Sequence, residues 1–221
     1  PAIPGRAATT GGMLLAIQAS MKPFLIVLAT REGHTRRIAE HVSSSLQQHG
    51  ATVQVMSAAD AAQNLDLAEF AMVILAASVH MGKHDREMVA FVKAHKAALL
   101  EVPTAFLSVS LTEAAVENEA LSEEQRARAH AEVEQAIDAF FETTDFRPTS
   151  YHAIAGALVY SRYNWLIRLI MTRVARSKGA STDATQDHEY TNWIDLDHFI
   201  ASLLSGEIPH SPGSVISQIS T

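Results

Sequence analysis

The sequence predicts a three-layer α/β fold, in which a five-stranded parallel sheet carries helices on both faces. Two observations lead to this prediction. Short apolar segments alternate with segments whose apolar residues recur at helical spacing, which is the pattern of a parallel sheet. In addition, a polar loop at residues 29–35 joins the first predicted strand to the first predicted helix, where such sheets bind their ligands.

The predicted strands are short and bounded by polar or proline residues. In chain order they are residues 24–28, 52–56, 71–77, 104–109 and 152–158. Residues at helical spacing mark four helices. The first contains Ile38, Val42 and Leu46, and the second contains Met88, Phe91, Val92, His95 and Leu99. The third contains Val133, Ile137, Phe140 and Phe141, and the last begins at about Trp193 and contains Leu196, Phe199, Ile200 and Leu203.

The third helix is predicted from about Ser122 to Glu142. It begins at a capping-box pattern, in which Ser122 is followed three residues later by Gln125. Its outer face is acidic, and we assign its apolar stripe to the core rather than to a docking surface.

The loop after the first strand has the chemistry of a phosphate site. Thr30 and Thr35 can donate to phosphate oxygens, and Gly33 allows close approach of the backbone at a helix N-terminus. With one glycine and no lysine, the loop fits neither the Walker pattern nor the dinucleotide pattern, so a terminal monophosphate is the expected ligand. The alternative is an ordinary strand-to-helix turn with Thr35 as the N-cap.

Composition indicates one globular domain and argues against several classes of function. The chain has 221 residues, 48% of them apolar, and a formal net charge of -7, which argues against a nucleic-acid partner. Cysteine is absent, so no disulfide framework or thiolate chemistry is expected. No apolar run approaches the roughly 18 residues of a membrane span.

The two ends of the chain are expected to lie outside this domain. Residues 1–20 begin with proline and lack the pattern of a secretory signal, so we interpret them as an upstream or expression-derived extension before Met21. The domain is predicted to span 21–204, and 205–221 to form a flexible tail.

Two further strand ends carry small, hydrogen-bonding residues. Residues 77–84 follow the third strand, and residues 108–112 follow the fourth. Since the carboxyl ends of parallel strands share one edge of a sheet, a planar cofactor could lie between these loops.

At these positions the chain resembles the flavodoxin-like superfamily and, more closely, the menaquinone-dependent protoporphyrinogen oxidase family. The similarity covers about residues 22–204 and rests on the segments at 29–35, 77–82, 108–111, 156–165 and 182–193. The resemblance implies a flavodoxin-like sheet in the order 2-1-3-4-5, an insertion at about 159–190 after the fifth strand, and FMN as cofactor. The implied FMN contacts are Thr30, Arg31, Glu32, Gly33, His34, Thr35, Ala77, Ser78, Val79, His80, Gly82, Ser108, Val109, Ser110, Leu111, Gly156, Ala157 and Leu158.

The insertion has the composition of a helix that lies at a membrane interface. Its segment 162–178 has no acidic residue and contains the cations Arg162, Arg168, Arg173, Arg176 and Lys178 among aromatic and aliphatic side chains. We therefore expect Tyr160, Arg162, Tyr163, Trp165 and Arg168 to contact substrate or membrane. The alternative is a solvated basic face over an ordinary core helix, with these aromatic residues packed inside the protein.

The resemblance implies an enzyme that oxidises protoporphyrinogen IX, for haem biosynthesis, and passes electrons to menaquinone or ubiquinone. It also implies a cytoplasmic protein on the inner face of the cell membrane. Arg162 would then pair with the porphyrinogen propionates. The alternatives are a flavodoxin-like electron shuttle, a related FMN-dependent quinone reductase, and an interaction module without FMN.

Some roles stay unassigned in the sequence, which singles out no catalytic acid or base and no oligomeric state. His80 and His84 have a spacing that could suit a metal, but no third ligand is apparent, so no metal site is predicted and His80 is placed near the flavin instead. His34 is expected either to donate to the phosphate or to be exposed to solvent.

Overall fold

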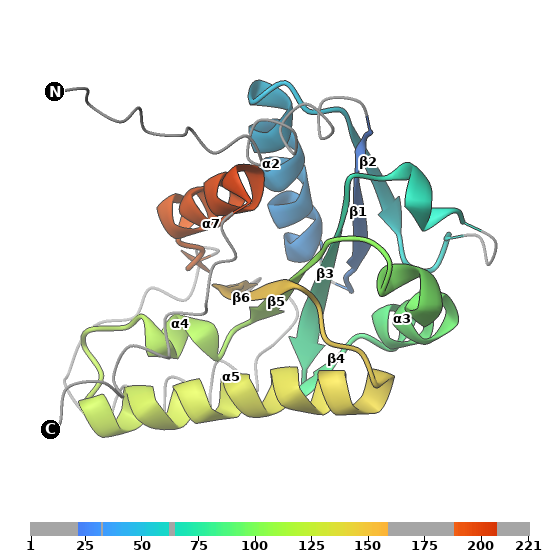
Figure 1. The fold of residues 1–221 in the computed structure, drawn as a ribbon. Helices are drawn as coiled ribbons and strands as arrows, with labels where there is room; N and C mark the ends of the chain where they lie inside the picture. The colour runs from blue at the N-terminus through green and yellow to red at the C-terminus, as the bar shows by residue number, and fades with distance from the viewer. Residues whose placement is uncertain (1–21, 32, 62–64, 159–187, 207–221) are drawn as a thin grey trace, which may run out of the picture.

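A parallel sheet forms the centre of the computed structural model, which describes residues 22–31, 33–61, 65–158 and 188–206 (Figure 1). Its strands are β1 (Phe24–Ala29), β2 (Val53–Ser57), β3 (Met72–His80), β5 (Thr104–Ser110) and β6 (Ser150–Ala155). They lie in the order β2-β1-β3-β5-β6, with all neighbours parallel, which confirms the predicted order 2-1-3-4-5. A two-residue strand that was not predicted, β4 (Lys83–His84), pairs antiparallel with β3.

Helices cover both faces of the sheet, as expected. The main helices are α2 (His34–Gln48), α3 (Arg86–Leu99), α5 (Glu123–Thr144) and α7 (Trp193–Ser205). The short elements α4 (Glu113–Val116) and the 3-10 turn η1 (Leu67–Glu69) complete the connections. In Figure 1, α2 and α7 lie on one side of the sheet and α3 and α5 on the other.

Two cores result from this layering. In β1, Leu25 and Val27 pack with α3 and α5, whereas Ile26 and Leu28 pack with α2 and α7. All six residues of β1 are buried, because a central parallel strand is covered on both faces. The apolar stripe of α5 is buried, as predicted, at Ala129, Val133, Ala136, Ile137, Phe140 and Phe141.

The predicted capping box of α5 is present in the structure. The Ser122 hydroxyl accepts from the Gln125 N–H at 3.2 Å, and the Gln125 side chain accepts from the Ser122 N–H at 3.0 Å. These two bonds satisfy N–H groups that would otherwise lack a partner at the helix start. None of the described helices has the length and apolar content needed to cross a membrane.

The predicted bounds of the fifth strand, 152–158, are wrong. The strand β6 ends at Ala155, and the next two residues form β7 (Ala157–Leu158), which pairs antiparallel with β8 (His188–Glu189) in a separate sheet. The physical reason is the length of the neighbouring strand. Because β5 ends at Ser110, opposite Ala155, it has no residues left to pair with the chain beyond Gly156.

Candidate cofactor site

The phosphate loop leaves β1 and enters α2 at the carboxyl edge of the sheet. Gly33 is the N-cap, with a φ of 89° that disfavours other residues, and a Cβ there would meet no atom within 4 Å. Its N–H donates to the Thr30 hydroxyl at 3.1 Å. Its carbonyl oxygen accepts from the backbone N–H groups of Arg36 and Arg37, at 3.1 and 3.2 Å. The alternative with Thr35 as N-cap is therefore wrong.

This loop fits a phosphate group. The helix α2 begins at His34, so its first N–H groups point out of the helix N-terminus toward the loop. The first turn of α2 contains no acidic residue, which there would compete with a phosphate for the positive end of the helix dipole. The Thr30 hydroxyl accepts from Gly33, which leaves its own proton for a ligand oxygen.

His34 is held inside the protein. Its exposed fraction is 8%, which overturns the alternative of a solvent-exposed side chain. Its Nε2 lies 2.8 Å from the Thr191 hydroxyl, which donates to the Ala155 carbonyl oxygen at 2.8 Å. Since the hydroxyl has one proton, the Nε2 of His34 is the donor to Thr191. Thr35 is also buried, at 1% exposure.

The loop after β3 folds back as a hairpin and is bonded to the phosphate loop. Asp85, directly after β4, has a side chain that is only 5% exposed. Its carboxylate accepts from the Ser78 hydroxyl at 3.1 Å and from the Nε of Arg31 at 3.3 Å, and its N–H donates to the Ser78 carbonyl oxygen at 3.1 Å. Asp85 thus contacts two of the predicted FMN residues.

The neighbouring residue, His84, bonds to strand β5. Its Nε2 lies 2.9 Å from the Ser108 hydroxyl on β5, and its ring is 5.0 Å from the rings of both Phe106 and Phe140. Burial lowers the pKa of His84 to about 4, against smaller opposing effects of the Ala136 backbone and the Asp85 carboxylate. The imidazole is therefore neutral at physiological pH.

The ends of β5 and β6 approach closely at the same edge. The Gly156 N–H donates to the Ser110 carbonyl oxygen at 2.9 Å, and a Cβ on Gly156 would lie 3.5 Å from the Ser110 carbonyl carbon. The Ser110 hydroxyl accepts from the Glu113 N–H at 3.2 Å and so directs the chain into α4.

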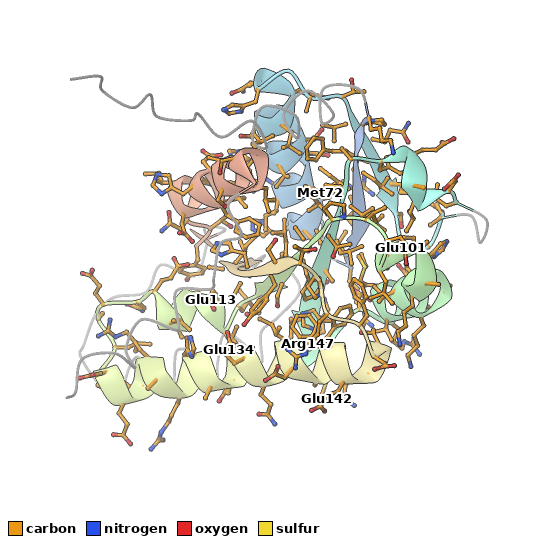
Figure 2. All side chains as sticks on the ribbon, viewed as in Figure 1. Met72, Glu101, Glu113, Glu134, Glu142 and Arg147 are labelled. Atoms are coloured by element: carbon orange, nitrogen blue, oxygen red, sulfur yellow. The ribbon has the colours of Figure 1, made fainter. Side chains whose placement is uncertain are left out.

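Acidic side chains gather beyond this strand end. Figure 2 shows Glu113 on α4 and Glu134 on the adjacent α5. Burial, followed by the charges of Glu117, Glu134 and Asp195, raises the pKa of Glu113 to about 7. Burial and Asp195 also raise the pKa of Glu117. Glu113 can therefore take up or release a proton near neutral pH.

Asp195 also holds His152 on β6. The Nε2 of His152 lies 2.8 Å from the Asp195 carboxylate, and its ring stacks on Phe199 at 4.8 Å. Burial lowers the pKa of His152, although Asp195 opposes the effect.

The structure brings most of the predicted FMN residues to one edge, but not all in the same way. Ala77, Ser108 and Val109 are buried within their strands, and Gly82 forms the hairpin turn with Met81, both at positive φ. Ser78 and Val79 lie within the last three residues of β3, His80 and Ser110 are the last residues of β3 and β5, and Thr30, Arg31, Gly33 and Leu111 lie beyond strand ends. The described part of the chain contains no group of three potential metal ligands.

The remaining predicted contacts lie outside the described residues. They are Glu32 in the phosphate loop and the insertion residues Tyr160, Arg162, Tyr163, Trp165 and Arg168. Conversely, the sequence prediction missed Asp85 and Thr191 as partners of this site, as well as Glu113. Thr191 did carry a signal, because it lies in the segment 189–193 that resembles the oxidase family.

Comparisons with known proteins agree with this arrangement. A family model described as a flavodoxin domain matches residues 25–185. Protoporphyrinogen IX dehydrogenase (quinone) of Escherichia coli K12 is 29% identical over 175 residues, which cover 79% of this chain and 91% of that protein. The Leishmania major protein of the same name is 27% identical, over 82% of this chain and 74% of its own length. These relatives confirm the family resemblance seen in the sequence.

Among solved structures, the flavodoxin of Streptococcus pneumoniae TIGR4 is 20% identical, with a TM-score of 0.38. The match covers 59% of this chain and 81% of that chain.

Proposed function

Because the chain belongs to the flavodoxin domain family, we propose that it is an FMN-dependent oxidoreductase that converts protoporphyrinogen IX to protoporphyrin IX with a membrane quinone as acceptor. The observation that carries the proposal is the start of α2, where Gly33 at positive φ and the Thr30 hydroxyl lie at the same sheet edge as the ends of β3 and β5. The substrate and the acceptor follow from the names of the two relatives.

The chain's own residues would hold the two ends of FMN separately. The N–H groups of His34 and Thr35 and the hydroxyl of Thr30 would bind the phosphate. The hairpin after β3 and the loop after β5 would border the ring system, next to Ala77, Ser108 and Val109, which are buried in these strands. Bound FMN supplies the two-electron redox chemistry, while the protein orients it and limits access to it.

The basic insertion would serve the substrate side of the reaction. Both protoporphyrinogen IX and a quinone are hydrophobic, so a peripheral contact between the insertion and the membrane would bring the protein to them. Arg162 and Arg168 are proposed to pair with the propionates of the porphyrinogen, since arginine binds carboxylates in a bidentate way. Either menaquinone or ubiquinone fits this role.

An anaerobic assay tests this function. The flavin-loaded full chain is mixed with protoporphyrinogen IX, and the flavin absorption is followed before and after addition of menaquinone or ubiquinone. We expect reduction by the porphyrinogen and reoxidation by a quinone. Reduction only by a protein donor would instead support an electron shuttle, and a chain that binds no flavin would support an interaction module.

The variant Arg162→Ala with Arg168→Ala separates substrate contact from cofactor binding. Turnover with porphyrinogen should fall much more than FMN retention does. Equal loss of both would contradict the assignment of these arginines to the substrate.

A further inference from the structure

The carboxyl-terminal parts of β3 and β5 and the phosphate loop, which surround the proposed FMN site, all contact two consecutive residues, His84 and Asp85. His84 bonds to Ser108 of β5, while Asp85 bonds to Ser78 of β3 and to Arg31 of the phosphate loop. Nothing in local helix formation requires these bonds, since Asp85 is the N-cap of α3 but makes no side-chain capping bond. Its carboxylate is directed toward the end of β3 and the phosphate loop instead.

The ion pair of Asp85 with Arg31 joins the two ends of the site. Arg31 lies in the loop proposed to bind the phosphate, and Ser78 lies near the end of β3, at the base of the hairpin proposed to border the ring. The Asp85 side chain is 5% exposed, whereas that of Arg31 is 54% exposed. A buried carboxylate with two donors has a defined position, so it can transmit a displacement of one loop to the other.

We propose that Asp85 is a positioning residue that couples the phosphate loop to the ring loop, so that the two ends of FMN bind cooperatively. The inference rests on the proposed function, because it takes FMN as the ligand. Occupancy of the phosphate site fixes the 30–33 loop, the Arg31–Asp85 pair holds the hairpin at 78–85 against it, and the ring then binds to a loop already in place. By linkage, ring binding favours phosphate binding to the same extent.

The two halves of the ligand can be titrated separately. Riboflavin is titrated into the flavin-free full chain, with flavin fluorescence as the readout, in the absence and in the presence of saturating inorganic phosphate. For the wild-type chain we expect phosphate to tighten riboflavin binding by a factor in the usual range of allosteric coupling, roughly 5 to 150. In Asp85→Asn this factor should fall close to one, while riboflavin alone binds about as well as to the wild type.

A second variant and a matched control keep the test decisive. Arg31→Gln removes the other half of the Arg31–Asp85 pair at a half-exposed position, and it should reduce the coupling factor as much as Asp85→Asn does. The double variant of Arg31 and Asp85 should show no further reduction of that factor. Asp138→Asn makes the same chemical change in the exposed ion pair with Arg147, before β6, and should retain the wild-type factor. Urea unfolding of each variant verifies that it is folded.

The outcomes separate this inference from the proposed function. Coupling that survives in both Asp85→Asn and Arg31→Gln, or that is lost equally in Asp138→Asn, would overturn the role of Asp85. Wild-type protein that binds flavin without any effect of phosphate would also overturn it, and would leave the proposed function standing. A wild-type chain that binds neither riboflavin nor FMN would overturn both.

Discussion

The imidazole of His34 and the hydroxyl of Thr191 are 2.8 Å apart, although 157 residues separate them in the chain. Through Thr191 the start of α2 is bonded to the Ala155 carbonyl oxygen at the end of β6. The phosphate loop is thereby attached to the segment that returns after the insertion. The His34–Thr191 hydrogen bond therefore connects the start of α2 with the end of β6 at the proposed FMN site.

Removal of the Thr191 hydroxyl should destabilise the fold. Thr191→Val keeps the shape of the side chain but leaves the buried His34 N–H and the Ala155 carbonyl without this partner, so we expect a loss of about 1–3 kcal/mol in the free energy of unfolding. Urea unfolding measures it. Thr191→Ser, which keeps the hydroxyl, should recover most of the loss; a serine variant as unstable as the valine variant would contradict the role of the hydrogen bonds.

Gly33 should be required for FMN binding because of its backbone conformation. Alanine at a φ of 89° is strained by about 1 kcal/mol or more, although the space for a Cβ is open. We expect Gly33→Ala to weaken FMN binding, measured by fluorescence titration. Gly50→Ala provides a control with a similar φ of 84° at the far end of α2, and it should lose stability without losing FMN affinity. Equal effects of both variants on FMN affinity would argue against a phosphate site at Gly33.

Glu113 should make the protein less stable as the pH rises. Its folded-state pKa of about 7 lies above its ordinary value of 4.5, so the folded protein holds the proton more tightly. The stability linked to this proton is complete below pH 4.5 and is lost as the pH rises through 7. Glu113→Gln should therefore gain up to about 3 kcal/mol relative to the wild type at a pH above 7, and much less at a pH near 4.5.

Unfolding in urea at the two pH values measures this difference. Glu142→Gln, at an exposed position of α5, is the matched control for removal of a carboxylate from the surface, and it is measured at the same two pH values. A Glu113→Gln gain of the same size at both pH values would show that proton binding is not its cause.

His84 should make the protein less stable as the pH falls, which is the opposite of the effect of Glu113. Its folded-state pKa of about 4 lies below its ordinary 6.5, so the stability linked to the neutral ring is present above pH 6.5 and is lost as the pH falls through 4. We expect His84→Gln to be less stable than the wild type near pH 7, because the Ser108 and phenylalanine contacts change, yet to lose less stability on acidification. The slope of unfolding free energy against pH is the measurement. An unchanged slope would contradict burial of a neutral His84.

Much of the architecture could be predicted from local patterns. The apolar run at 24–28 is short and follows Pro23, which favours a buried strand, and the spacing of Ile38, Val42 and Leu46 indicates an amphipathic helix. The capping box at Ser122 is similarly local, because its two bonds lie within four residues. The order of the strands came from the family resemblance rather than from such patterns.

The interior of the site could not be predicted in this way. His84 and Asp85 look like an ordinary helix entrance in sequence, and only the fold shows that they bond to Ser108, Ser78 and Arg31 from three other segments. The end of β6 depends equally on a distant feature, the length of β5. Contacts of this kind depend on tertiary packing, which no local period encodes.

The central claim is that a flavin phosphate binds at the start of α2, and the ratio of two affinities tests it most directly. FMN and riboflavin are each titrated into the flavin-free full chain under identical conditions. We predict one FMN per chain, bound at least tenfold more tightly than riboflavin, which corresponds to about 1.4 kcal/mol for the phosphate contacts. Equal affinity for the two flavins, or no binding of either, would contradict the claim.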